Sequence, residues 1–190
     1  MENKNAWEKY PQGEDRQKLM DFAESYRRFI SKCKTERECV ELAVELEEKA
    51  GYHNFEEYLS EERQIQKGEK IYAVCMKKCI VLFRMGAEPI SAGMNILGAH
   101  IDSPRIDIKQ NPLYEKDDFT YLDTHYYGGI KKYQWVTQPL ALHGVVVKKD
   151  GSCVNISIGE REDEPVFVIT DLLVHLASKQ LEKKAGEVIE

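Results

Sequence analysis

The spacing of apolar residues changes once along this 190-residue chain, from a helical period in the first third to strand-like runs after residue 70. Between residues 15 and 30, apolar side chains recur every three or four positions, as on one face of an amphipathic helix. Thr35 and Glu38 form the pattern of a capping box, which predicts a second helix ending near Gly51. Two helices followed by strands predict an α/β sandwich whose sheet is incomplete.

Three apolar runs follow the predicted helices and read as strands, at Lys70–Cys75, Cys79–Arg84 and Met94–Ile101. The third run is apolar on both faces, which is typical of a central strand. We therefore expect residues 1–104 to form an α/β domain.

The second half of the chain is rich in strands and turns and predicts a separate small domain at residues 105–190. Asp150-Gly151 marks a hairpin between two of its strands. The last twenty residues, from Asp171 onward, carry leucines on one side and predict a terminal helix. Strands are predicted at 105–109, 119–127, 140–147, 153–158 and 166–169.

The composition excludes several classes of partner. A net charge of −6 argues against nucleic acid or an anionic membrane as the main partner. No run approaches the ~18 apolar residues that a membrane span needs, and the first residues contain no apolar signal core. The sequence therefore predicts a cytoplasmic protein.

The five cysteines are an odd number and none has Cys-x-x-Cys spacing. Cys75 and Cys79 have the spacing of half a metal clip, but a second half is missing. Free cysteine packs as a small hydrophobic residue, so buried free thiols are the favoured interpretation, in a reducing compartment.

A histidine and an aspartate follow the third apolar run. His100 and Asp102 are two residues apart, so on a strand they lie on one face. A histidine there can bind a metal ion while the carboxylate orients it. Pro104 has no backbone N–H to donate to a neighbouring strand, so it ends the predicted strand and begins a loop. The alternative is a solvated strand end, because a mononuclear site needs three or four ligands and the others are not obvious.

Several collinear motifs resemble the aspartyl-aminopeptidase-like family of zinc aminopeptidases, in its bacterial branch. The segment that begins at Gly98 and ends at Pro104 is similar to the first metal-binding motif of that family. Further matches occur in the same order along the whole chain, at Trp7 and Tyr10, 35–38, Asn111-Pro112, 127–129, Trp135 and 169–176.

This resemblance implies a catalytic α/β domain of the zinc-exopeptidase type with two metal ions, usually zinc although other divalent metals are possible. It implies that His100 is a metal ligand and that Asp102 supports it. It also implies an inserted β-rich dimerisation domain, dimers that assemble into a dodecamer, and removal of N-terminal residues from peptide substrates.

The chain departs from the family in two respects. The remaining ligands of the family come from much later positions, so these residues are expected to be an N-terminal fragment without activity of its own. The alternative is a non-catalytic assembly module.

Acid-specific members carry Asp-Arg-Asp-Leu where this chain has residues 136–140, and a histidine where it has Asp171. A peptide substrate with a neutral or basic N-terminal residue is thus at least as favoured as one with an acidic residue. His125 and Asp171 are weak candidates for substrate binding.

Overall fold

The structure, a computed structural model, describes residues 5–189 and divides the chain into two units between Asp102 and Ser103. The roles expected for them, part of a catalytic domain and part of a dimerisation insert, remain predictions.

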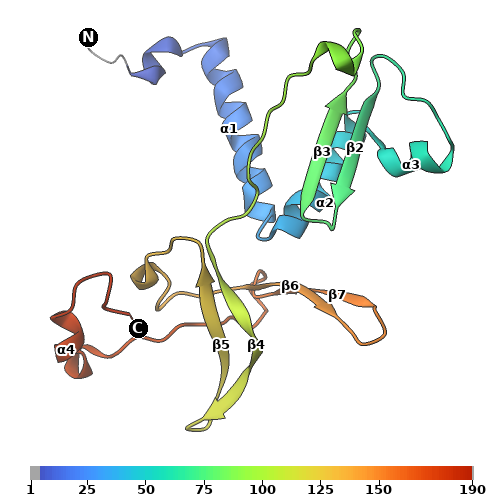
Figure 1. Cartoon of the computed structure of the whole chain (residues 1–190). Coiled ribbons are helices and arrows are strands. Elements are labelled where there is room, and N and C mark those ends of the chain that lie inside the picture. The colour runs from blue at the N-terminus through green and yellow to red at the C-terminus, as the bar shows by residue number, and fades with distance from the viewer. Residues whose placement is uncertain (1–4, 190) are drawn as a thin grey trace. The chain divides into compact units, whose positions relative to one another are not determined.

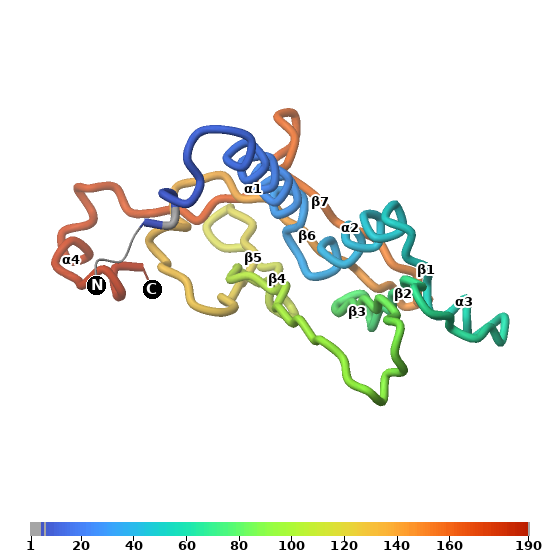
Figure 2. The backbone as a smooth tube through the Cα atoms, turned by 90° about the horizontal axis from the view of Figure 1, so that it is seen from above, coloured from blue at the N-terminus to red at the C-terminus, as the bar shows by residue number. Residues whose placement is uncertain are grey.

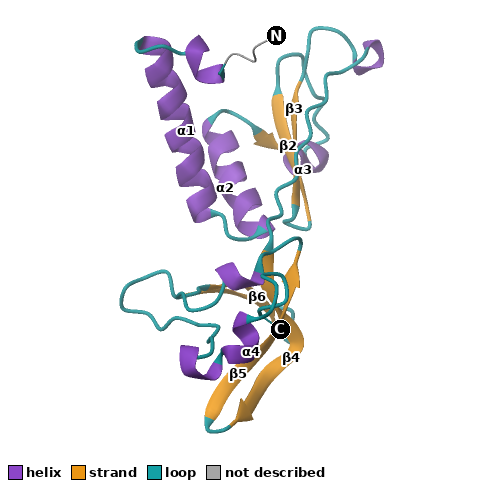
Figure 3. Ribbon diagram, turned by 90° about the vertical axis from the view of Figure 1, so that its left-hand side faces the viewer, coloured by secondary structure: helices purple, strands orange, loops and turns teal. Residues whose placement is uncertain are grey.

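The first unit contains the two predicted long helices, α1 (Glu14–Lys32) and α2 (Glu36–Lys49), which lie side by side (Figures 1 and 3). The capping box is present: Thr35 Oγ1 accepts from the Glu38 N–H at 3.3 Å, and a Glu38 carboxylate oxygen accepts from the Thr35 N–H at 2.9 Å. Gly51 has a φ of +86°, the left-handed conformation in which helices commonly end. The sequence prediction of this helix pair is confirmed.

A three-stranded sheet packs beside α2, in the order β1-β2-β3. Strand β1 (His53–Asn54) runs parallel to β2 (Lys70–Cys75), and β2 runs antiparallel to β3 (Cys79–Arg84). Strands β2 and β3 have the predicted bounds. The short strand β1 and the helix α3 (Phe55–Ser60) after it complete this region.

The core of the first unit lies around β2. Ile71 and Tyr72 are 1% and 4% exposed, and they are neighbours in the strand, so their side chains point to opposite faces. Strand β2 is therefore covered on both faces. Val40 of α2 and Tyr58 of α3 are also buried, and the Tyr72 hydroxyl donates to a Glu48 carboxylate oxygen at 2.7 Å.

The predicted third strand, Met94–Ile101, is wrong. These residues run as an extended loop between β3 and the second unit, and Leu97 is 98% exposed (Figures 1 and 2). The apolar pattern of a central strand is present, but a strand exists only where neighbours accept its backbone hydrogen bonds. Within residues 5–189 this segment has no strand neighbour.

The second unit consists mainly of two antiparallel hairpins. One joins β4 (Arg105–Lys116) to β5 (Phe119–Tyr127), with an irregularity between Ile108 and Leu113. The other joins β6 (Leu142–Val147) to β7 (Cys153–Ile158), and Gly151 in its turn has a φ of +82°. The Asp-Gly prediction of a hairpin is confirmed, whereas residues 166–169 form only two isolated bridges.

The predicted terminal helix from Asp171 onward is also wrong. Only a 3-10 turn at Val174–Leu176 and the short α4 (Ser178–Leu181) form there. Leu172, Leu173 and Leu176 are exposed. Most helical stability in proteins comes from packing an apolar face, and the described residues of this unit leave the leucine side uncovered. Further 3-10 turns lie at Ala6–Lys9, Ile90–Ala92 and Lys132–Gln134.

No helix within residues 5–189 combines the length and the apolar character needed to cross a membrane.

Removal of the capping hydroxyl at Thr35 should measurably weaken the first unit. We expect Thr35→Ala to lower the free energy of unfolding by about 1 kcal/mol, because the Glu38 N–H loses its acceptor. Thr35→Ser keeps the hydroxyl and serves as the matched control. Urea unfolding followed by circular dichroism measures both, and equal losses in the two variants would contradict a capping role.

Candidate functional site

The loop before the second unit brings His100 and Asp102 into contact. The His100 Nδ1 atom lies 3.2 Å from a carboxylate oxygen of Asp102 and 3.0 Å from its backbone oxygen. The two side chains are thus adjacent, as expected, although the segment is a loop and not a strand end. The imidazole is 85% exposed.

This contact defines which nitrogen of His100 can bind a metal ion. In the tautomer with the proton on Nδ1, the ring donates to Asp102 and Nε2 carries the lone pair. A carboxylate that holds a histidine in this way fixes its tautomer and orientation for metal binding. The donor chemistry therefore fits a zinc ion, which accepts imidazole nitrogen readily.

The number of donors, by contrast, is too small for a complete site. Among residues 5–189, no three His, Cys, Asp or Glu side chains are grouped so that they could hold a metal ion. Zinc sites use three or four protein ligands. At His100 the described residues therefore offer one imidazole beside one carboxylate, which is short of a complete zinc site.

The two weak candidates for substrate binding lie in the second unit and make local contacts. Asp171 accepts hydrogen bonds from the Gln180 side chain and from the Leu172 N–H, each at 2.8 Å, which hold the pKa of its carboxyl below the ordinary value. His125 lies on β5 opposite Asp107, with Nδ1 3.2 Å from the backbone oxygen of Tyr126. These contacts are typical of loop and strand structure, and a substrate role for either residue remains a prediction.

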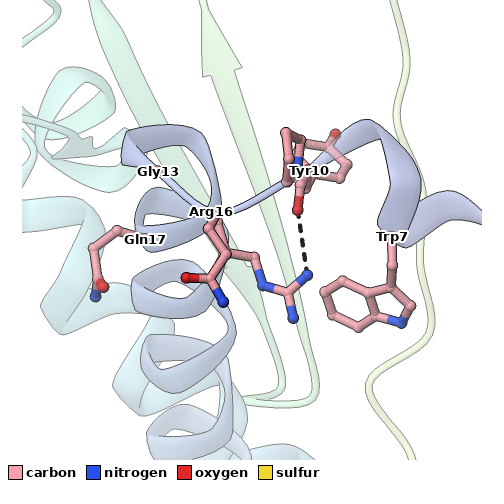
Figure 4. Close-up of a pocket in the computed structure, with 7 residues that line it drawn as sticks. Trp7, Tyr10, Gly13, Arg16 and Gln17 are labelled. Carbon is pink, nitrogen blue, oxygen red and sulfur yellow. Dashed lines mark hydrogen bonds between the residues drawn. The ribbon is translucent and has the colours of Figure 1, made fainter.

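Figure 4 shows a shallow hollow near the N-terminus that the sequence did not reveal. The Arg16 guanidinium lies 4.3 Å from the centre of the Trp7 ring and donates to the backbone oxygen of Tyr10 at 3.3 Å. None of its lining residues is a histidine, cysteine, aspartate or glutamate: Trp7, Tyr10, Pro11, Gln12, Gly13, Arg16 and Gln17. The hollow therefore lies around a cation–π contact between the N-terminal turn and α1. Its lining offers no histidine, cysteine or carboxylate for metal binding or acid–base chemistry.

The prediction of buried thiols is wrong. Cys75, Cys79 and Cys153 are exposed, and Cys33 and Cys39 are half-buried. Burial beside Cys39 raises the pKa of the Cys33 thiol to about 12. Cys75 ends β2 and Cys79 begins β3 at an exposed turn, so an apolar, strand-like run does not ensure that its terminal residue is buried.

Comparison with known proteins agrees with the motifs. The model of the family described as "Aminopeptidase I zinc metalloprotease (M18)" matches residues 29–189. A probable M18 family aminopeptidase 1 of Clostridium acetobutylicum is 56% identical over 191 residues, which cover all of this chain and 40% of that protein.

Two solved structures are similar in fold. The crystal structure of aminopeptidase I from Clostridium acetobutylicum matches 98% of this chain and 41% of its own, with 50% identity and a TM-score of 0.82. The M18 family aminopeptidase of Thermotoga maritima matches 98% of this chain and 39% of its own, with 38% identity and a TM-score of 0.85.

The chain therefore belongs to the M18 family of zinc metallo-aminopeptidases, which are hydrolases. It spans about 40% of the length of the curated relatives it matches. The predicted resemblance is confirmed, including its restriction to part of a family member. The α/β fold class is also confirmed by the structural matches.

Proposed function

We propose that this chain contributes the first metal ligand of a zinc-dependent aminopeptidase site that removes N-terminal residues from peptides. The observation that carries the proposal is the contact between His100 Nδ1 and the Asp102 carboxylate, in a member of a zinc metalloprotease family. The site in the complete enzyme holds two ions, and its other ligands come from residues outside these 190.

Each residue has a distinct task in this proposal. His100 offers Nε2 to the metal, and Asp102 accepts a hydrogen bond from the Nδ1–H and so holds the orientation of the ring. Zinc held there would polarise the scissile carbonyl and lower the pKa of a bound water molecule. Asp102 also keeps negative charge next to the imidazole, which strengthens its donor nitrogen.

The proposed substrates are peptides with a neutral or basic N-terminal residue. Asp171 stands where acid-specific members carry a histidine, and its carboxylate would repel an acidic side chain. We further propose that the enzyme acts in the cytoplasm as a dimer-based homo-oligomer, with the β-rich second unit as part of the dimerisation insert.

A non-catalytic assembly module is the second candidate, and one observation favours it. Met94, Ile96 and Leu97 are exposed in an extended segment without a strand neighbour among the described residues. Such a segment offers backbone donors and acceptors and apolar side chains to a partner chain.

The two candidates predict different activities for a longer protein that contains this chain. One protein is the 190-residue chain, and the other joins it to the portion of the Clostridium acetobutylicum relative that the 191-residue match leaves out. We expect zinc-dependent release of N-terminal residues from peptides by the extended protein and none by the short chain. Peptides beginning with leucine, lysine or aspartate test the substrate preference.

Measured zinc-dependent turnover by the 190-residue chain alone would contradict the proposal that the other metal ligands come from residues outside it. A folded extended protein that binds zinc but releases no N-terminal residue would favour the assembly module instead.

A further inference from the structure

Two cysteines face each other where the β2–β3 hairpin closes. Strand β2 ends at Cys75, strand β3 begins at Cys79, and the register pairs these two residues directly. Directly paired residues on antiparallel strands have Cα atoms about 4.5–5.5 Å apart and side chains on the same face. A disulfide spans Cα separations of about 4.4–6.8 Å. The register therefore brings the two thiols within bonding reach.

The turn between the cysteines is held against α2 by two contacts. The Arg37 guanidinium donates to the backbone oxygen of Met76 at 3.3 Å, and the Lys77 ammonium lies 3.3 Å from a Glu41 carboxylate oxygen. Both contacts join residues more than thirty positions apart, so they depend on the folded unit. The folded unit therefore keeps the two thiols in one arrangement.

Access and charge favour reaction with a small anionic disulfide. Cys75 and Cys79 are both exposed, and Lys77 and Lys78 stand between them in the sequence. Oxidised glutathione carries net negative charge at neutral pH, and nearby lysines attract it.

The other close pair of thiols is less suited to this reaction. Cys33 is half-buried beside Cys39, and its pKa of about 12 leaves little thiolate at neutral pH. The thiolate is the reacting species, so this pair should react more slowly.

We propose that Cys75 and Cys79 form a dithiol–disulfide site that exchanges with low-molecular-weight disulfides of the glutathione type. One cysteine thiolate attacks a sulfur of oxidised glutathione, forms a mixed disulfide and releases one glutathione thiolate. The second cysteine thiolate then attacks the protein sulfur of the mixed disulfide and releases the other glutathione. The protein loses two electrons and two protons, and both glutathione thiols gain them.

The geometry also makes the site reversible. The Cβ atoms of direct cross-strand pairs lie about 4.5–5.5 Å apart, whereas a disulfide prefers about 3.5–4.5 Å. A bond closed from the longer separations in this range is strained, and a strained, exposed disulfide is readily reduced. This redox site is independent of the proposed metal site and does not rest on it.

A matched pair of variants tests the register. Both carry Cys33→Ser, Cys39→Ser and Cys153→Ser, and the control also carries Val74→Cys with Cys75→Ser. Because Val74 pairs with Ile80, its side chain points to the other face of the sheet from Cys79. The control thus keeps two thiols nearly as close in sequence but removes them from a common face.

Trypsin cleaves after Lys77 and Lys78, so in both variants a disulfide joins peptide 71–77 to peptide 79–84 and mass spectrometry identifies it. Each protein is equilibrated with fixed ratios of reduced and oxidised glutathione, in buffer and in concentrated urea. In buffer, we expect an equilibrium constant for the linked form at least about tenfold larger for the Cys75–Cys79 protein than for the control. In urea the two constants should be similar, because the register is lost.

Similar constants for the two proteins in buffer would overturn the proposal. So would single glutathione adducts without the linked peptide, or a wild-type chain in which Cys33–Cys39 is the main disulfide formed.

Discussion

His100→Ala in the extended enzyme should reduce zinc-dependent peptide hydrolysis by about a thousandfold or more. A metal ion contributes several kcal/mol of transition-state stabilisation, and each ~1.4 kcal/mol corresponds to a factor of ten in rate. His100 Nδ1 lies 3.2 Å from the Asp102 carboxylate, and no cluster of three donor side chains exists among residues 5–189, so no neighbouring described side chain replaces His100 as a ligand. The measurement is kcat/KM for a peptide substrate together with bound zinc by metal analysis.

Asp102→Asn separates a supporting role from a ligand role. The asparagine keeps an oxygen near His100 Nδ1 but removes the negative charge, so we expect a loss of about 10–100-fold in zinc affinity or activity. His53→Ala, at an exposed histidine on β1, serves as the control and should change neither quantity. If His100→Ala retained wild-type activity and zinc content, the assignment of this residue as a ligand would be wrong.

Ile71→Ala should destabilise the first unit by about 2–5 kcal/mol, the range found when a buried large aliphatic side chain is truncated. Ile71 is 1% exposed in the strand that is covered on both faces, so the smaller side chain leaves a cavity that its neighbours fill only in part. Urea unfolding followed by circular dichroism gives the difference in the free energy of unfolding. The expected loss is a large fraction of the stability of a small domain.

Val81→Ala is the matched control for this core substitution. Val81 lies on the neighbouring strand β3 but is 46% exposed, so truncation should cost below about 1 kcal/mol, the range of strand propensities. Equal losses at positions 71 and 81 would show that the core does not lie around β2.

The sequence predicted those elements whose stability depends on nearby residues. The capping box at Thr35 and Glu38 set the start of α2, and Gly51 set its end, because both act within a single turn of chain. Strands β2 and β3 were predicted with correct bounds, since a three-residue turn joins them. The Asp150-Gly151 hairpin followed from the same kind of local rule.

Two of the predictions that failed concern apolar runs whose partners are distant. Met94–Ile101 has the pattern of a central strand and residues after Asp171 have that of a helix, but neither finds a partner surface among the described residues. Apolar periodicity shows which face an element would bury, and it does not show whether another element is there to cover that face.

For the candidate site, the sequence by itself determined the family and predicted the pair His100 and Asp102, because side-chain chemistry and spacing are local properties. Only the tertiary structure decided that His100 and Asp102 touch through a loop contact, that no third donor joins them within residues 5–189, and that Cys75 and Cys79 face each other in solvent. The first and third facts depend on the backbone conformation of a loop and a hairpin, and the second depends on which segments the fold brings together. Side-chain spacing in the sequence fixes none of these, because the same spacing gives different contacts in a strand, a loop and a helix.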